Sequence, residues 1–226
     1  MENARPPVHP RPLFPDWNRD DADDFKNVAD TIFSPLYRWL IVDIEASLGR
    51  PIRGLRALDI GGGPGHMAVE LLKAGAESVV EVDVSKPMLE LAVEHVSGLG
   101  HALSAKFTAL SGDAAAIPLP AGSVDLVFSR GSIQFWPDLP AAFDEMKRVL
   151  AEGGAAYVGG GYGLRIPAEV REEIVRRRAK RDAEVGAPRI PPMDRDAMER
   201  LARERGGTVE MFGNPPGFWL FWKPSR

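Results

Sequence analysis

The chain has 226 residues, of which 44% are hydrophobic and 27% are charged, and its formal net charge is −4. This composition is globular, the length suits one α/β domain with extra segments, and collagen-like or extensively disordered classes are excluded. No apolar run reaches the ~20 residues that span a bilayer, and the lack of cysteine excludes disulfides and thiolate chemistry. We therefore expect a cytoplasmic protein with no membrane partner, and the mild acidity argues against nucleic acid.

The N-terminal part of the chain predicts an arm followed by two helices. Five prolines in residues 1–15 exclude a helix or a central strand there. Apolar residues at spacings of three and four then predict a helix over residues 25–33. We expect Ser34-Pro35 to break it, so that residues 36–48 form a second helix.

From residue 55 onward, short apolar strands alternate with helices. The expected strands cover residues 55–60, 79–83, 106–110, 124–128 and 155–159. The expected helices cover residues 66–74, a segment that begins at Ser85, and residues 138–150. This alternation predicts a parallel sheet that is covered by helices on both faces.

The C-terminal third departs from this alternation. Two charged helices are expected at about 168–182 and 195–205, joined by a proline-rich connection. Residues 208–212 and 218–222 read as the two strands of a hairpin, so the last strand should run antiparallel to its neighbours.

The clearest functional signal is the segment LDIGGGPG at residues 58–65, which joins a strand to a helix. Glycines let the backbone turn tightly and approach a ligand, and the following helix offers unpaired N–H groups. Asp83 ends the second strand, where a carboxylate can accept hydrogen bonds from both ribose hydroxyls. This pattern fits a dinucleotide or S-adenosylmethionine (SAM). His66 stands where the dinucleotide fingerprint requires glycine, which favours SAM.

Four segments resemble motifs of the class I SAM-dependent methyltransferases, specifically the small-molecule group that includes the ubiquinone/menaquinone-biosynthesis methyltransferases. They are ALDIGGGPGHMAVELLKAG, VVEVDVSKPMLELA, SGDAAAIPLPAGSVDLVFSRGSIQFWPD and AAFDEMKRVLAEGGAAYVGGG, in the family's order within residues 55–160. The resemblance implies a Rossmann-like α/β fold, with a seven-stranded, mostly parallel sheet that ends in an antiparallel hairpin. We expect an arm and helical lid over residues 1–48 and a SAM-binding domain over residues 49–226, with a helical insertion at about 165–205.

The resemblance also implies roles for individual residues. Those that would contact the cofactor are Asp59, Gly61, Gly63, Gly65, Asp83, Val84, Met88, Asp113, Ala114 and Ser129. Asp59 would hold the glycine loop and the amino group of SAM, whereas Asp83 would bind the ribose. Met88 or Val84 would pack on the adenine, and Asp113 would accept from the adenine amino group. The plainer alternatives are that Met88 belongs to a helix core and Asp113 to a turn.

Three residues are candidates for the methyl-transfer site itself. Arg130 follows the fourth strand, where the family commonly has a small residue or Asn, and it would point to the acceptor or to the SAM carboxylate. Tyr162 and Arg165 follow the fifth strand. Tyr162 could orient or deprotonate the nucleophile, and Arg165 could bind a carboxylate or phosphate of the acceptor. Alternatively, Tyr162 packs on the lid and Arg165 pairs with Glu169.

The histidines are weak candidates for a general base. His66 is expected to cap or pack its helix, and His95 and His101 are expected to lie in solvent. Gln134 stands where relatives often carry histidine. Tyr37 is better placed, since the N-terminal helices roof the pocket in this family.

These observations predict methyl transfer from SAM to a small-molecule acceptor, with S-adenosylhomocysteine (SAH) as the other product. The protein would act mainly by aligning the reactants and excluding water, and no metal-ligand spacing is present. One alternative is an RNA or protein methyltransferase that uses the basic stretch at residues 171–181, which otherwise forms a solvated helix with internal ion pairs. Another alternative is a non-catalytic SAM-binding protein, which is favoured by Arg130 and by the absence of a histidine at position 134.

Overall fold

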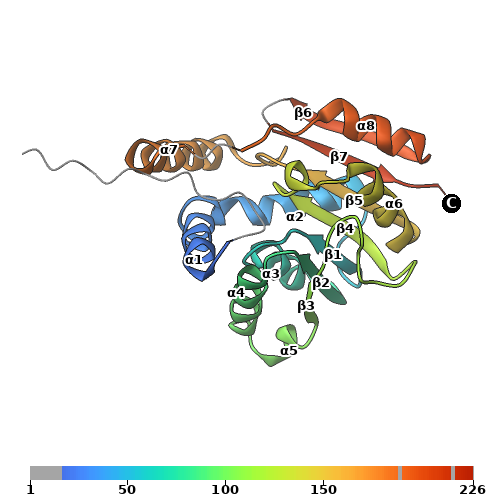
Figure 1. Ribbon diagram of the computed structural model, residues 1–226, viewed down its shortest axis with the longest axis horizontal. Helices are drawn as coiled ribbons and strands as arrows, with labels where there is room; N and C mark the ends of the chain where they lie inside the picture. Colours follow the sequence, from blue (N-terminus) through green and yellow to red (C-terminus); the bar gives the residue numbers. More distant parts are fainter. Residues whose placement is uncertain (1–16, 188–189, 215–216, 226) are drawn as a thin grey trace, which may run out of the picture.

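A computed structural model describes residues 17–187, 190–214 and 217–225, and the proline-rich arm at residues 1–15 lies outside this range. One sheet of seven strands forms its centre (Figure 1). The strands are β1 (Arg56–Ile60), β2 (Ser78–Asp83), β3 (Phe107–Ser111), β4 (Val124–Arg130), β5 (Leu150–Gly159), β6 (Thr208–Asn214) and β7 (Gly217–Lys223).

The strand order is β3-β2-β1-β4-β5-β7-β6. The first five strands are parallel, whereas β7 pairs antiparallel with β5 and β6 pairs antiparallel with β7. The predicted mostly parallel sheet with an antiparallel terminal hairpin is confirmed. The order reverses between β1 and β4, and ligands of open α/β sheets bind at the carboxyl ends of the strands beside such a reversal.

Helices cover both faces of the sheet. They are α1 (Arg19–Val28), the π-helix η1 (Ala29–Phe33), α2 (Ser34–Leu48), α3 (His66–Lys73), α4 (Lys86–Ser97), α5 (His101–Ser104), the short 3-10 helix η2 (Ile133–Phe135), α6 (Leu139–Val149), α7 (Ala168–Val185) and α8 (Arg195–Glu204). Apolar side chains of α2, α3 and α7 form one core with the sheet. Those of α6 and α8 form a second core on the opposite face.

The N-terminal helices differ from the sequence prediction. The break expected at Ser34-Pro35 is wrong, because α1, η1 and α2 follow one another without an intervening loop. Pro35 lies in the first turn of α2, a position that tolerates proline. The five-residue π-helix η1 lies between the two α-helices, and such segments are found frequently at functional sites.

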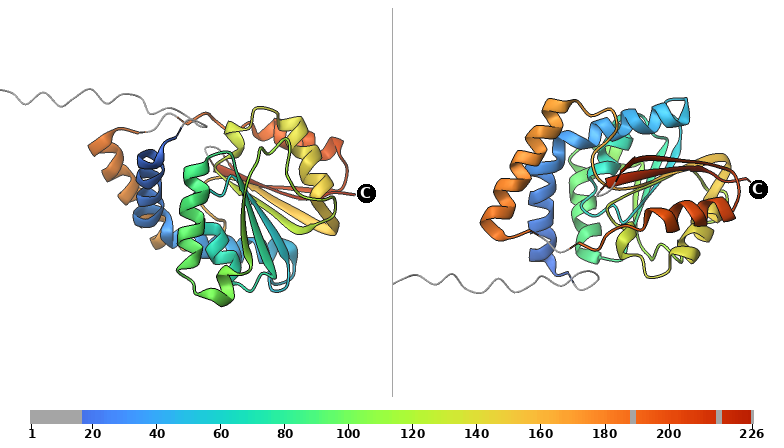
Figure 2. Two further views of the ribbon diagram at one scale, coloured as in Figure 1. Left: turned by 60° about the horizontal axis from the view of Figure 1, so that its bottom comes forward. Right: turned by 90° about the horizontal axis from the view of Figure 1, so that it is seen from above.

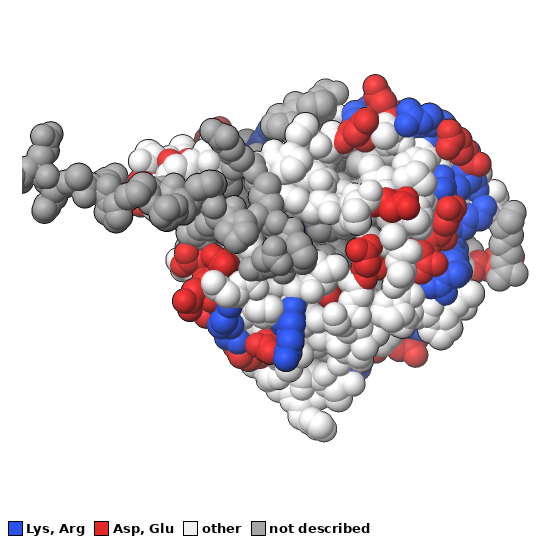
Figure 3. Space-filling model, viewed as in Figure 1, with Lys and Arg blue, Asp and Glu red and all other residues white. Residues whose placement is uncertain are grey.

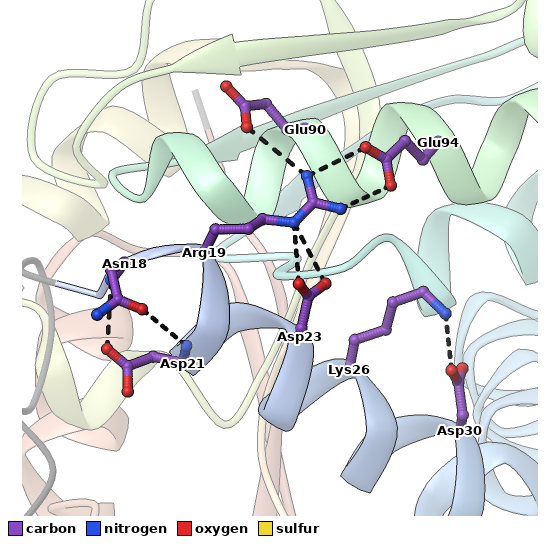
Figure 4. Close-up of polar contacts among 8 residues, drawn as sticks. All are labelled: Asn18, Arg19, Asp21, Asp23, Lys26, Asp30, Glu90 and Glu94. Carbon is purple, nitrogen blue, oxygen red and sulfur yellow. Dashed lines mark hydrogen bonds and ion pairs between the residues drawn. The ribbon is translucent and has the colours of Figure 1, made fainter.

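The N-terminal helices α1, η1 and α2, named the lid below after the sequence prediction, pack between α4 and α7, as both views in Figure 2 show. Arg19 on α1 forms ion pairs with Glu94 and Glu90 on α4, at N–O distances of 2.8 and 3.7 Å (Figure 4). On the other side, Nη1 of Arg177 on α7 donates to the Thr31 carbonyl at 2.8 Å. Polar contacts therefore join this N-terminal segment to both neighbouring helices.

Candidate functional site

The glycine loop adopts the backbone that its sequence predicts. Gly61, Gly63 and Gly65 have φ angles of 66°, 64° and 77°, a region that L side chains rarely adopt. A Cβ atom on Gly65 would also lie 3.0 Å from the Cα atom of Ala92. The loop between β1 and α3 is therefore held close to α4, with its backbone available to a ligand.

Three carboxyl groups lie buried beneath this loop. Asp59 on β1 and Glu81 on β2 are directly paired in the strand register, and Asp83 follows two residues later on the same face. Their exposed fractions are 1%, 0% and 4%. The Asp83 carboxylate accepts hydrogen bonds from the backbone N–H of Gly63 at 3.1 Å and of Ser85 at 2.8 Å.

The other two carboxyl groups have buried oxygens without a hydrogen-bond partner within the described ranges. These oxygens are Oδ2 of Asp59 and both side-chain oxygens of Glu81. Burial, with the nearby charge of Asp83, raises the pKa of Asp59 to about 8. Burial also raises the pKa of Glu81 well above its ordinary value. It raises that of Asp83 as well, although hydrogen bonds from the backbone oppose the rise. A cationic ligand at this end of the sheet would stabilise the ionised form of these carboxyl groups.

The end of β4 is joined to the glycine loop through Ser132. Its hydroxyl donates to the Ile60 carbonyl at 3.0 Å and lies 2.7 Å from the hydroxyl oxygen of Ser129. A Cβ atom on Gly61 would lie 2.4 Å from the Ser132 side chain, so the two loops are in contact. Ser129, a predicted cofactor contact, is fully buried, and its contact with a ligand stays a prediction.

Arg130 lies on the face of β4 that is turned toward the lid. Its guanidinium carbon lies 5.0 Å from the ring centre of Phe33 and 5.6 Å from that of Tyr37. Its Nε–H donates to the Gly161 carbonyl at the long distance of 3.4 Å. Burial lowers the pKa of this guanidinium, while Tyr37 and Tyr162 oppose the change.

His66 joins the glycine loop to the lid. Its Nε2–H donates to the Asp30 carboxylate at 2.6 Å, and its ring stacks on Tyr37 with centres 5.1 Å apart. Burial lowers the pKa of His66 to about 4 and raises that of Tyr37. Both side chains are therefore neutral near pH 7. The high pKa of Tyr37 makes it a poor general base, and the expectation that His66 packs is confirmed.

His95 does not lie in solvent as expected. Its Nδ1–H donates to the Pro64 carbonyl at 3.0 Å, and its ring meets that of His66 edge to face, with centres 4.6 Å apart. The prediction was wrong because the glycine loop and α3 cover this side of α4.

The predicted adenine contacts lie around the ends of β2 and β3. Met88 is fully buried and packs with Leu91 and Ala22, so it belongs to a small core between α4 and the lid. Val84 lies at the surface and is 44% exposed. Asp113 is part of a turn, as the plainer alternative predicted, since its Oδ1 accepts from the Ala115 N–H at 2.7 Å. Ala114 is buried. Their contact with adenine stays a prediction.

Tyr162 and Arg165 lie after β5, but Arg165 has a different partner from either expectation. The fully buried Asp43 on α2 accepts from the Arg165 backbone N–H at 3.1 Å and from its Nη1 at 3.2 Å. Glu169 does not take this place. Arg171 lies over the Tyr162 ring at 5.3 Å. Asp43 therefore attaches the segment after β5 to the lid.

The basic stretch on α7 forms internal ion pairs. Glu173 pairs with Arg176 and Arg177, the latter at 2.7 Å, and Arg178 pairs with Asp182 at 3.5 Å. On the face shown in Figure 3, acidic and basic residues are likewise interspersed over α8. These contacts fit a solvated, ion-paired helix.

Sequence reasoning missed three residues of this site. Glu81 could have been noted as an acid within an apolar strand, two residues before Asp83 and therefore on the same face. Ser132 and Asp43 gave no such signal, because each acts on a segment distant in sequence: Ser132 on Ile60, and Asp43 on Leu164 and Arg165.

The strand order, the glycine loop and the acidic end of β2 define a Rossmann-like domain of the methyltransferase type. A family model described as "Methyltransferase domain" matches residues 58–158. An S-adenosyl-L-methionine-dependent methyltransferase from Methanococcus maripaludis has a similar structure. The two share 28% sequence identity with a TM-score of 0.78, covering 96% of this chain and 97% of that one.

Curated relatives are similar over about half of this chain. A chloroplastic 2-methyl-6-phytyl-1,4-hydroquinone methyltransferase 2 from Oryza sativa subsp. japonica is 37% identical over 46% of this chain and 28% of its own length. The ubiquinone/menaquinone biosynthesis C-methyltransferase UbiE from Methylobacterium nodulans is 32% identical over 55% and 50%. The chain thus covers half or less of these relatives. The matched segment and these similarities support a class I SAM-dependent methyltransferase.

SAM is the cofactor that this family implies, and the residues present fit it. The left-handed glycine loop leaves backbone open to a ligand at Gly63, where an added Cβ atom would meet no neighbour closer than 3.7 Å. The unpartnered carboxyl oxygens of Asp59 and Glu81 suit a positively charged ligand. Among the described residues, no helix is long and apolar enough to cross a membrane.

Proposed function

We propose that this chain transfers a methyl group from SAM to a small-molecule acceptor and leaves SAH. The main support is the group of buried carboxyls Asp59, Glu81 and Asp83 under a glycine loop, because the methyl donor carries a sulfonium and an ammonium. We infer a cytoplasmic location and no metal requirement from the sequence.

The residues of the loop and strand ends would bind and orient. Asp59 would hold the ammonium group, and Asp83 the ribose hydroxyls, with its position fixed by the N–H groups of Gly63 and Ser85. Val84, Met88, Asp113 and Ala114 would surround the adenine. Bound SAM supplies an activated methyl group, so alignment and exclusion of water account for most of the rate enhancement.

The lid would exclude water from the reacting atoms. Phe33 and Tyr37 place aromatic rings over Arg130 at the end of β4, and Asp30 joins the lid to His66 beside the glycine loop. Tyr162 and Arg165 complete the acceptor side after β5. With the pKa of Tyr37 raised by burial, this residue would orient a nucleophile rather than deprotonate it.

A small-molecule acceptor is favoured over RNA or protein by two observations. The curated relatives include methyltransferases named for a phytyl hydroquinone and for ubiquinone and menaquinone biosynthesis. The basic stretch on α7, which could have met a nucleic acid, is instead occupied by ion pairs with Glu173 and Asp182.

The proposal is tested in two stages. Calorimetry should show that SAH binds and that NAD does not, since His66 replaces the glycine of the dinucleotide pattern. A metabolite extract incubated with methyl-labelled SAM and the protein should then give a labelled small molecule. Tighter binding of NAD than SAH would overturn the cofactor assignment. Binding of SAH with no labelled product from extract, RNA or protein would favour the non-catalytic alternative.

A further inference from the structure

Arg130 has no carboxylate partner in the part of the chain that the structure describes. Its only hydrogen bond there is the long one to the Gly161 carbonyl, and the charged side chain that acts on it is another cation, Arg178. Arg165, the other arginine expected on the acceptor side, differs because it pairs with the buried carboxylate of Asp43. Of these two arginines, only Arg165 has a carboxylate partner among the described residues, and the positive charge of Arg130 has none.

The surroundings of Arg130 hold it without neutralising it. Two aromatic rings from the lid, Phe33 and Tyr37, lie within cation–π distance. These contacts restrict the guanidinium. Apart from the hydrogen bond to the Gly161 carbonyl, its N–H groups have no acceptor among the described residues. A partly buried charge that has no carboxylate partner among the described residues is costly for a protein, which is consistent with a group kept for a ligand.

We propose that Arg130 binds a carboxylate or phosphate group of the methyl acceptor, so that the acceptor is an anionic small molecule. This rests on the proposed function. The planar guanidinium has several N–H donors in a fixed arrangement, which matches the oxygens of such a group. The anionic group would bind between the lid and the segment after β5, while Arg165 stays paired with Asp43.

The contacts of Arg130 favour the acceptor over the carboxylate of SAM. Its neighbours are Phe33 and Tyr37 of the lid, and Gly161 and Tyr162 of the segment after β5. None belongs to the glycine loop or to β2, where the cofactor would lie. The guanidinium thus faces the half of the pocket that is left for the second substrate.

The test uses simple anions as probes because the acceptor is unidentified. The full chain is saturated with SAH and titrated with benzoate, acetate and inorganic phosphate at constant ionic strength. The neutral isosteres benzamide and acetamide serve as controls, and binding is followed by ligand-observed NMR. We expect at least one anion to bind five times or more tightly than the neutral compounds. Arg130→Met should reduce this preference to less than twofold, and Arg130→Lys should retain part of it.

The matched control is Arg176→Met, which removes an exposed arginine of α7 that pairs with Glu173 and should leave the preference unchanged. A wild-type protein that binds SAH but does not prefer any anion would overturn the inference and leave the proposed function standing. If SAH itself does not bind, the proposed function fails instead.

A second measurement decides whether the anionic group that Arg130 binds belongs to the acceptor or to the cofactor. SAH and 5′-methylthioadenosine, which lacks the amino-acid part, are titrated into the wild type and Arg130→Met. We expect the variant to change both affinities less than threefold. A tenfold loss for SAH alone would assign Arg130 to the cofactor carboxylate and overturn the proposal. Circular dichroism checks that both Arg130 variants are folded, and Arg130→Lys keeps the test valid if the Met variant is not.

Discussion

The two sides of the switch in strand order carry ionisable groups of opposite kind that have no ion-pair partner among the described residues. At the ends of β1 and β2, Asp59 and Glu81 are buried with carboxyl oxygens that have no partner within the described residues. At the end of β4, Arg130 is held between aromatic rings with no carboxylate beside it there. The acids and the arginine do not neutralise one another. We infer that each side is complementary to a ligand of opposite charge.

Two ion pairs elsewhere in the described residues show the contrast. Arg56 binds Asp125 at the amino end of the sheet at 2.9 Å, and Asp43 binds Arg165 behind the lid. Unpaired buried charge lowers stability, and proteins retain it mainly where function requires it. The contrast between paired and unpaired groups therefore locates the site independently of motifs.

Removing Asp83 should have the largest effect on the acidic side. Asp83→Ala is expected to weaken SAH binding at least tenfold, because charged hydrogen bonds contribute about 1.5–3 kcal/mol each with incomplete additivity. Calorimetry on the folded variant measures this. Asp125→Ala is the matched control, since its carboxylate binds Arg56 away from the site, and it should leave SAH affinity intact. Equal affinities for wild type and Asp83→Ala would remove Asp83 from the ribose site.

The pH dependence of stability should expose the buried carboxyls. Burial raises the pKa of Asp59 to about 8, so near pH 7 the folded chain retains a proton that the unfolded chain has released. The free energy of unfolding should therefore fall as pH rises from 6.5 to 8, approaching about 1.4 kcal/mol per pH unit for one such group. Below that window, the lowered pKa of His66, about 4, has the opposite effect. Urea unfolding at several pH values measures the slope.

Asp59→Asn should flatten this slope, because it removes one of the groups that take up a proton on folding. Asp125→Asn serves as the control: Arg56 lowers the pKa of Asp125, so that carboxyl is already ionised throughout the window. A slope that is the same in Asp59→Asn and wild type would show that Asp59 does not titrate as a buried acid.

On the cationic side, loss of the charge should stabilise the ligand-free chain. Arg130→Met keeps an apolar side chain near Phe33 and Tyr37 while removing a desolvated charge that has no carboxylate partner among the described residues. We expect a gain on the order of 1 kcal/mol, because the cost of desolvation exceeds the lost cation–π contacts. Thermal unfolding, with Arg176→Met as the reference, measures it. A lower melting temperature would assign Arg130 to the structural core instead.

The smallest expected effect concerns the lid, which faces both sides. SAH should increase hydrogen-exchange protection of residues 25–40, which include η1, more than that of the sheet. Mass spectrometry of exchange with and without SAH tests this. Equal protection in both states would make the lid a fixed wall of the site.

Much of the fold was predictable because local rules agree with the tertiary structure. Short apolar strands, the left-handed glycines and the terminal hairpin all follow from residues that are close in sequence. The continuity of the helices through Ser34-Pro35 was not predictable in this way. Proline can stand in the first turn of a helix as well as end one, so the residues alone allow both outcomes. In the folded chain the lid helices are continuous and pack against α4 and α7.

The sequence by itself determined where the loop, Asp83 and Arg130 lie along the chain, because each is tied to the end of a strand. Only the tertiary structure decided which charges are compensated. Asp43 reaches Arg165 across 122 positions, Glu81 lies under Gly62, and Arg130 has aromatic neighbours instead of a carboxylate. Pairing and burial depend on segments that meet only after folding, so no local pattern encodes them.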